Sequence, residues 1–212
     1  KISRDETAWA IGGMLNGNIC LLSAGGIPGG YDLDKLNFLI NLMRVWGPNS
    51  VIIEKNMGFG AFKEVITPLV RESGVPCEVE DDMVSGQKEG RIIGTLAPIM
   101  GRGSLIVSTS VFEEDQRTVA GYPAAERQLY SLFFQLARLT SARDALIHDD
   151  RADALEGLCR SFQKDLAQDQ AKKLETVRAR QHEEAMKDPL GHNRYQRYPK
   201  HGRGTSMLRH RR

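Results

Sequence analysis

The segment Val51-Ile52-Ile53-Glu54-Lys55-Asn56 is an apolar, β-branched run that ends on a single carboxylate. Far along the chain, Ile147-His148-Asp149-Asp150-Arg151-Ala152-Asp153 places an acidic pair where a helix is expected to begin. Strands buried in an α/β sheet and helices that follow them bring such carboxylates to one edge of the sheet. Carboxylates at such an edge can hold divalent metals, which activate water against a phosphodiester and stabilise the leaving oxygen. The two segments together predict a metal-dependent nuclease.

The composition limits which classes of protein the chain can belong to. The 212 residues suffice for one domain with a full core and an appendage, and 41% hydrophobic with 26% charged residues is ordinary for a soluble globular protein. No apolar run approaches the roughly 18 residues of a membrane span, so no membrane association is expected. The three cysteines lie far apart and form no Cys-x-x-Cys pair, so we expect buried thiols in a reducing cytoplasm. A start at Lys1 without a signal peptide suggests a fragment or a processed product.

The net charge of +2 hides an asymmetry along the chain. Residues 171–212 hold 12 Lys and Arg against 4 Asp and Glu, which leaves an acidic body and a basic end. We expect a nuclease domain over 1–158, a charged C-terminal helix over 159–188, and a basic, disordered tail over 189–212.

Hydrophobic periodicity and turn residues predict alternating strands and helices. Asn16-Gly17 signals a hairpin, Asp32 can cap a helix that Gly47 ends, and Asp149 starts the last core helix. From Glu156 the pattern predicts one long, highly charged helix. The expected strands cover 7–15, 18–24, 50–54, 77–80 and 105–108, and the expected helices cover 33–46, 61–73, 87–100, 126–140 and the segment from 149. This order indicates a mixed sheet with helices on both faces.

Each acidic candidate has a structural alternative. Glu54 would lie at the carboxyl edge of the sheet, or would simply pair with Lys55. Asp149 and Asp150 could be helix caps, which the helix dipole favours. Asp153 lies three residues after Asp150 and therefore faces the same side of the helix. Helix capping alone does not require this additional acidic residue.

Basic residues, Lys55 among them, supply the candidate DNA contacts. Lys88 and Arg91 lie one turn apart and could clamp a phosphate, the alternative being a solvated helix face. Arg194, Arg197 and Lys200, interleaved with tyrosines, could bind DNA or dock on another protein, the alternative being a merely solubilising terminus.

Five motifs in order closely resemble the C-terminal nuclease domain of phage terminase large subunits, the DNA maturases of short-tailed, autographivirus-like phages. The resemblance runs from about Asp5 to Leu158. The motifs are Asp5-Glu6-Thr7-Ala8, Pro28-Gly29-Gly30-Tyr31, Ile53-Glu54-Lys55-Asn56-Met57-Gly58-Phe59-Gly60-Ala61-Phe62, Gly86-Gln87-Lys88-Glu89-x-Arg91-Ile92 and His148-Asp149-Asp150-Arg151-x-Asp153-Ala154-Leu155.

The resemblance implies an RNase H-like (resolvase/integrase-type) α/β fold and cleavage of concatemeric double-stranded DNA with two Mg²⁺ or Mn²⁺ ions. Three acidic positions of the family hold the metals. The second matches Glu54, and the third matches Asp149-Asp150, with Asp150 the preferred ligand and Asp153 a helper. Oxygen ligands suit these hard cations.

The family's first acidic residue ends an opening strand that precedes the segment matching Asp5-Glu6-Thr7. We therefore expect the sheet to lack that strand, with an unfilled place in it, and Asp5 to be a poor substitute ligand. Weak metal binding or slow cleavage by the chain follows from this expectation.

The family also implies partners. These are double-stranded phage DNA, the portal protein of the procapsid and the small terminase subunit, met in the host cytoplasm at the portal. The phosphate-binding motif Gly-x-x-x-x-Gly-Lys-[Ser/Thr] of ATP-driven motors does not occur in the chain. Two other functions stay open: a Holliday-junction-type resolvase, which would prefer branched DNA, and a non-catalytic module that docks DNA or the portal.

Overall fold

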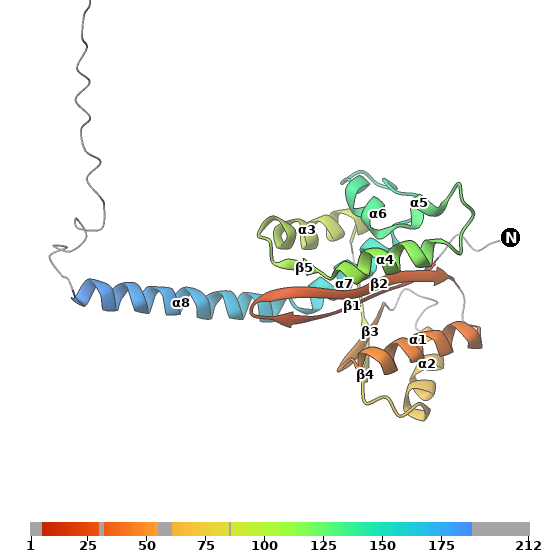
Figure 1. Ribbon diagram of the computed structural model, residues 1–212, viewed down its shortest axis with the longest axis horizontal. Helices are drawn as coiled ribbons and strands as arrows, with labels where there is room; N and C mark the ends of the chain where they lie inside the picture. The colour runs from red at the N-terminus through yellow and green to blue at the C-terminus, as the bar shows by residue number, and fades with distance from the viewer. Residues whose placement is uncertain (1–5, 30–31, 55–60, 85, 188–212) are drawn as a thin grey trace, which may run out of the picture. The chain divides into compact units, whose positions relative to one another are not determined.

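The computed structural model describes residues 6–29, 32–54, 61–84 and 86–187 (Figure 1). The described part contains strands and helices in the alternation that the sequence predicts. In chain order they are β1 (Glu6–Leu15), β2 (Asn18–Pro28), α1 (Leu33–Trp46), β3 (Ser50–Glu54), α2 (Ala61–Glu72), β4 (Glu78–Asp82), α3 (Lys88–Gly101), β5 (Leu105–Val107), α4 (Thr109–Val119), α5 (Arg127–Tyr130), α6 (Leu132–Arg138), α7 (Asp150–Ser161) and α8 (Gln163–Lys187).

The hairpin of β1 and β2 confirms the turn signal between them. Asn16 and Gly17 have φ values of 52° and 73°, the left-handed conformation that a tight hairpin requires at both turn positions. The strands pair antiparallel from Leu15 opposite Asn18 to Glu6 opposite Pro28, so β2 continues past its expected end at Ala24.

The predicted mixed sheet is present, and the described strands form two sheets in all. β1, β2 and β5 form one, with β2 antiparallel to β1 and parallel to β5, while β3 and β4 form a parallel pair. Among the described residues no strand is hydrogen-bonded between β1 and β3.

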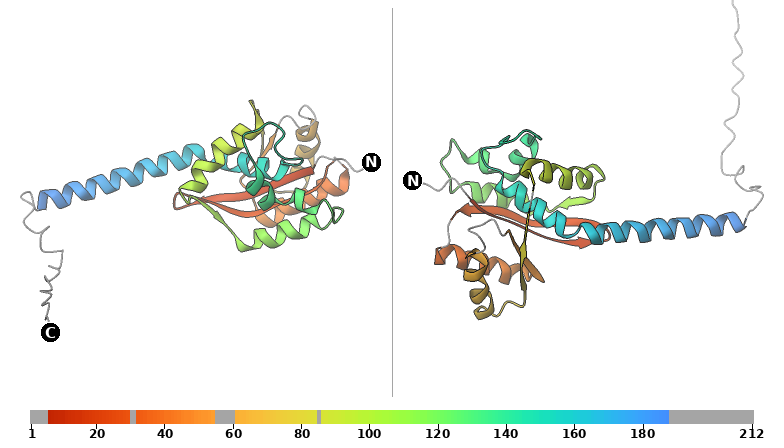
Figure 2. Two further views of the ribbon diagram at one scale, coloured as in Figure 1. Left: turned by 90° about the horizontal axis from the view of Figure 1, so that it is seen from above. Right: turned by 180° about the vertical axis from the view of Figure 1, so that it is seen from behind.

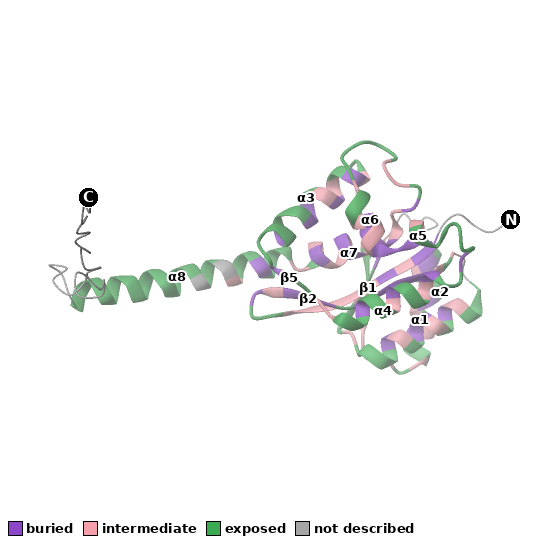
Figure 3. Cartoon of the chain, turned by 45° about the horizontal axis from the view of Figure 1, so that its top comes forward, coloured by how far each residue is buried: buried purple, intermediate pink, exposed green. Residues whose placement is uncertain are grey.

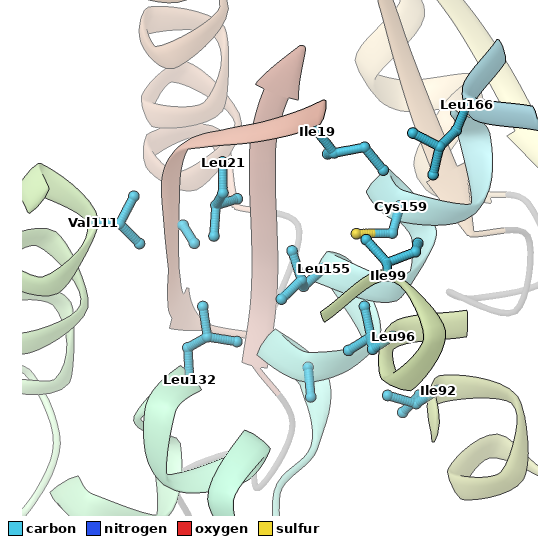
Figure 4. Close-up of a cluster of buried hydrophobic side chains, with 12 residues drawn as sticks. Ile19, Leu21, Ile92, Leu96, Ile99, Val111, Leu132, Leu155, Cys159 and Leu166 are labelled. Carbon is cyan, nitrogen blue, oxygen red and sulfur yellow. The ribbon is translucent and has the colours of Figure 1, made fainter. Parts of the chain in front are cut away.

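Two hydrophobic clusters cover opposite faces of the hairpin. The first gathers Ile19 and Leu21 of β2 with side chains of α3, α4, α6 and α7, as Figure 4 shows. The second gathers Trp9 of β1 with side chains of α1, β3 and α2. Helices α1 and α2 thus lie on one side of the β1–β2 ribbon, and α3, α4, α6 and α7 lie on the other (Figures 1 and 2). The structure has the α/β layers of an RNase H-like fold.

Three helical predictions need correction. Helix α4 was not expected. The predicted helix over 126–140 is divided into α5 and α6 at Ser131, which adopts an extended conformation and accepts a hydrogen bond from the Phe134 amide. The long helix expected from Glu156 is also divided, because α7 ends at Ser161 and α8 begins at Gln163.

By their contacts the residues form two compact units, Lys1–Ala167 and Gln168–Arg212. Leu166, near the end of the first unit, is buried in the first cluster. The described residues of the second unit belong to α8 and are largely exposed (Figure 3). No described helix combines the length and the apolar character needed to span a membrane.

Candidate active site

The acidic pair lies at the start of α7, as predicted. Asp149 is the N-cap residue of the helix, but its side chain forms no capping hydrogen bond. Its carboxylate instead accepts a hydrogen bond from Lys88 Nζ at 2.8 Å. The side chain of Asp149 therefore does not act as a helix cap.

Lys88 and Arg91 join α3 to α7 through carboxylates. Lys88 Nζ lies 2.8 Å from Asp149 and 3.1 Å from Asp153, and Arg91 Nη2 lies 2.7 Å from the other oxygen of Asp153. Arg91 also pairs with Glu156, whose side chain is fully buried. Burial acts to lower the pKa of Lys88, but the charges of Asp153 and Asp149 outweigh it and the pKa is raised. The two basic residues are partners of internal carboxylates and not a solvated helix face.

Asp150 differs from its acidic neighbours. Among the described residues, the ion pairs at the start of α7 engage Asp149 and Asp153 and not the carboxylate of Asp150. Burial raises the pKa of Asp150 to about 6, with Lys88 acting against this and the charge of Asp149 adding to it. Binding a cation would relieve the cost of ionising this half-buried carboxyl group.

Beside Asp150 lies a buried charge network that the sequence patterns did not predict. The guanidinium of Arg151, which has no exposed surface, contacts Glu6 Oε1 at 2.7 Å and Asp115 Oδ1 at 2.6 Å. Glu6 also accepts a hydrogen bond from the Tyr122 hydroxyl at 2.9 Å. The one sequence signal was the charge of Arg151, because a cation in the first turn of a helix opposes the helix dipole and needs a compensating partner.

His148 is anchored on the same side of the site. Its ring stacks on Tyr130 with centroids 3.9 Å apart, and Tyr130 stacks on Tyr122 at 3.8 Å. The His148 ring therefore lies at the end of a stack of three aromatic rings.

Glu54 ends β3 as predicted and lies opposite Asp82 in the register of the β3–β4 pair. Asp82 pairs with Arg160 at the far end of α7. The other candidates, Asp5, Lys55, Arg194, Arg197 and Lys200, lie outside the described residues.

The donor set suits a divalent cation in kind, since Mg²⁺ and Mn²⁺ prefer carboxylate oxygens. The start of α7 already binds one cation, because the Lys88 ammonium lies between Asp149 and Asp153. In the described ranges, however, no group of three or more His, Cys, Asp or Glu side chains is arranged to hold a metal ion. The ligand roles of Glu54, Asp149, Asp150, Asp153 and Asp5 therefore stay predictions.

The layers, the mixed strand directions and the acidic start of α7 define an RNase H-like α/β domain. Residues 3–105 match the family model described as Terminase Bacteriophage T7, Ribonuclease H-like domain. The chain is also 36% identical over 151 residues, 71% of its length, to the terminase large subunit of Enterobacteria phage T3. The chain is thus similar to the RNase H-like domain of phage terminase large subunits. The match covers 26% of the T3 protein's length.

Proposed function

We propose that this chain is a metal-dependent endonuclease domain that cleaves concatemeric double-stranded phage DNA during genome packaging. The observation that supports the proposal is the difference between Asp150 and the two other acidic residues at the start of α7. Asp149 and Asp153 are already paired with Lys88 and Arg91, whereas no described ion pair engages Asp150, and burial raises the pKa of Asp150. Perturbed carboxyl groups of this kind cluster at functional sites.

In this proposal Asp150 and Glu54 hold Mg²⁺ or Mn²⁺, and Asp149 and Asp153 support them. When bound, two such ions supply an activated water and neutralise charge on the departing oxygen. The chain itself orients part of the site, because Lys88 holds the carboxylates of Asp149 and Asp153.

DNA would be bound mainly through its phosphates. Lys88 and Arg91 would contact the backbone only if their ion pairs with Asp149 and Asp153 open. The basic residues of the tail, with Arg194, Arg197 and Lys200 among them, add sequence-independent affinity that decreases steeply with salt. The portal protein and the small terminase subunit are the protein partners we propose, in the host cell at the procapsid.

The test is cleavage of supercoiled plasmid with Mn²⁺ by the chain and by Asp150→Asn, Glu54→Gln and Asp149→Asn variants. Asp34→Asn, on the exposed first turn of α1, is the matched control. We expect Asp150→Asn and Glu54→Gln to abolish nicking, Asp149→Asn to reduce it less, and Asp34→Asn to leave it unchanged.

Two outcomes oppose the proposal. Preferential cutting of four-way junctions over plasmid would favour a junction resolvase. Absence of Mn²⁺-dependent cleavage in every variant, together with retained DNA binding, would favour a non-catalytic docking module.

A further inference from the structure

The cations of α3 and the carboxylates of α7 form a row of ion pairs that runs from the interior to the surface. At the buried end, Arg91 pairs with Glu156, whose carboxylate is fully buried. At the exposed end, Lys88 Nζ pairs with Asp149 at 2.8 Å, and these two side chains are 36% and 23% exposed. Asp153 lies between the two ends and contacts both Arg91 and Lys88.

The exposed end of this row can open at little cost to the fold. An exposed ion pair typically changes an equilibrium constant by no more than about fivefold, because water solvates both groups when they separate. If Lys88 leaves, Asp153 keeps its 2.7 Å contact with Arg91, and Asp149 is exposed enough to be hydrated. Opening the Arg91 pair would instead remove a cation from the buried Glu156 carboxylate, which is costly. Lys88 is therefore the α3 cation that can change its partner.

A DNA phosphate is an anion that can compete with Asp149 for Lys88. A lysine that binds a phosphate releases counterions condensed on the DNA, and pairing with a carboxylate of its own chain brings no such gain. The gain increases as the salt concentration falls, so DNA binding at low salt favours the exchange. In the paired state the Asp149 carboxylate both engages Lys88 and repels a phosphate beside it.

We propose that the Asp149 carboxylate blocks a phosphate-binding site at Lys88, and that the DNA backbone opens this site by taking the place of the carboxylate. The inference rests on the proposed function, because it takes DNA as the ligand. It adds which cation contacts the phosphate and which acidic residue limits that contact. Arg91 stays with Asp153 and Glu156 and keeps α3 joined to α7 during the exchange.

Asp149 then has two effects of opposite direction. It supports cleavage in the proposed function, whereas its pairing with Lys88 weakens DNA binding. Asp149→Asn should therefore bind duplex DNA more tightly while it nicks plasmid less. Loss of one negative charge would also raise DNA affinity in a general way, so the test must measure whether Asp149 acts through Lys88.

The experiment is a double-mutant cycle on the full chain, measured by fluorescence anisotropy with a labelled duplex over a series of salt concentrations. EDTA is present, so that metal-dependent cleavage does not interfere. The four proteins are the unsubstituted chain, Lys88→Gln, Asp149→Asn and the double variant. A matched control cycle uses Lys63→Gln and Asp81→Asn, because this ion pair between α2 and β4 has a 3.1 Å contact and is 32% and 34% exposed. Urea unfolding verifies that the variants are folded.

We expect Asp149→Asn to raise DNA affinity by about fivefold at low salt. The slope of log affinity against log salt should steepen by up to about 0.9, the value for one additional phosphate contact. Lys88→Gln should lower affinity by a larger factor in the Asp149→Asn background than in the unsubstituted chain. The two substitutions of the control cycle should be additive.

An equal loss of affinity from Lys88→Gln in both backgrounds would overturn the blocking role of Asp149 while leaving the proposed nuclease intact. Coupling of the same size between Lys63 and Asp81 would also overturn it, because general charge effects would then account for the result. Failure of the unsubstituted chain to bind DNA would refute the DNA association that the proposed function requires, and this inference with it.

Discussion

Asp150 is a carboxyl group whose ionisation burial opposes. Its pKa is raised from 3.8 to about 6, so the folded state holds the proton more tightly than the unfolded state. The resulting penalty is absent below about pH 4, grows as the pH rises toward 6, and is complete above that value. Asp150 therefore decreases stability at neutral pH, as expected for a group retained for function.

We expect Asp150→Asn to raise the free energy of unfolding by on the order of 2 kcal/mol at pH 7.5, with the gain vanishing near pH 4. Urea unfolding at a series of pH values measures this, with the exposed Asp34→Asn as control. An equal change at both ends of the pH range would contradict the assignment of the penalty to Asp150.

Arg151, in contrast to Asp150, stabilises the folded state, because two buried carboxylates rely on its charge. Arg151→Met leaves Glu6 and Asp115 without their cation, and removing one partner of a buried pair typically costs about 3–5 kcal/mol. We expect a loss of this size in chemical unfolding. Arg117→Met, which removes an exposed side chain that pairs with Glu114 of the same helix at 3.4 Å, should change little. Comparable losses in the two variants would argue against the network.

At the scale of elements, α3 and α7 are joined by alternating charges. Glu156 accepts hydrogen bonds from Arg91, Thr95 and Arg160, and Arg160 reaches Asp82 at the end of β4. One carboxylate thus links two helices, and through Arg160 links α7 to the β3–β4 pair that carries Glu54.

Glu156→Ala should decrease the free energy of unfolding by about 3 kcal/mol, because Arg91 then lies partly buried without its main partner. Differential scanning fluorimetry at several urea concentrations would detect the change. The exposed Glu184→Ala in α8 serves as the control. A loss confined to metal binding, with stability intact, would disprove a structural role for Glu156.

The helix ends that depend on neighbouring residues in the sequence were predicted correctly. Asp32 accepts a hydrogen bond from the Lys35 amide at 3.1 Å, and Gly47 adopts the left-handed conformation that ends α1. Ser131 was mistaken for the interior of a helix because, besides its local capping contact with Phe134, its hydroxyl donates to the distant Asp115 at 2.6 Å. Periodicity contains no information on such a contact.

The candidate site was predictable only in part for the same reason. The placement of Asp149 and Asp150 at a helix start follows from neighbouring residues, and so does Glu54 at a strand end. The pairing of Arg151 with Glu6 joins the two ends of the domain and depends on packing that composition and spacing do not express.

For the whole molecule, the division after Ala167 suggests that stability and DNA affinity reside in different units. The second unit, Gln168–Arg212, carries most of the excess positive charge. A chain ending at Ala167 keeps Leu166 and the hydrophobic clusters. Its unfolding midpoint should match that of the full chain, whereas its affinity for nonspecific DNA and its salt dependence should both decrease.

Fluorescence anisotropy with labelled duplex DNA at increasing salt concentrations measures the second effect. Replacing Arg194, Arg197 and Lys200 with Gln in the full chain should reproduce part of it. An unchanged salt slope in the truncated chain would show that the tail does not contact DNA.

The contact between Arg151 and Glu6 closes a loop of 145 residues. Contacts of such separation form late in folding, because most of the chain must be ordered before they can stabilise it. During synthesis Glu6 leaves the ribosome long before Arg151 exists, and domains fold as units once their parts are available. A nascent chain that ends before α7 therefore lacks both Asp150 and the Arg151 guanidinium with which Glu6 pairs.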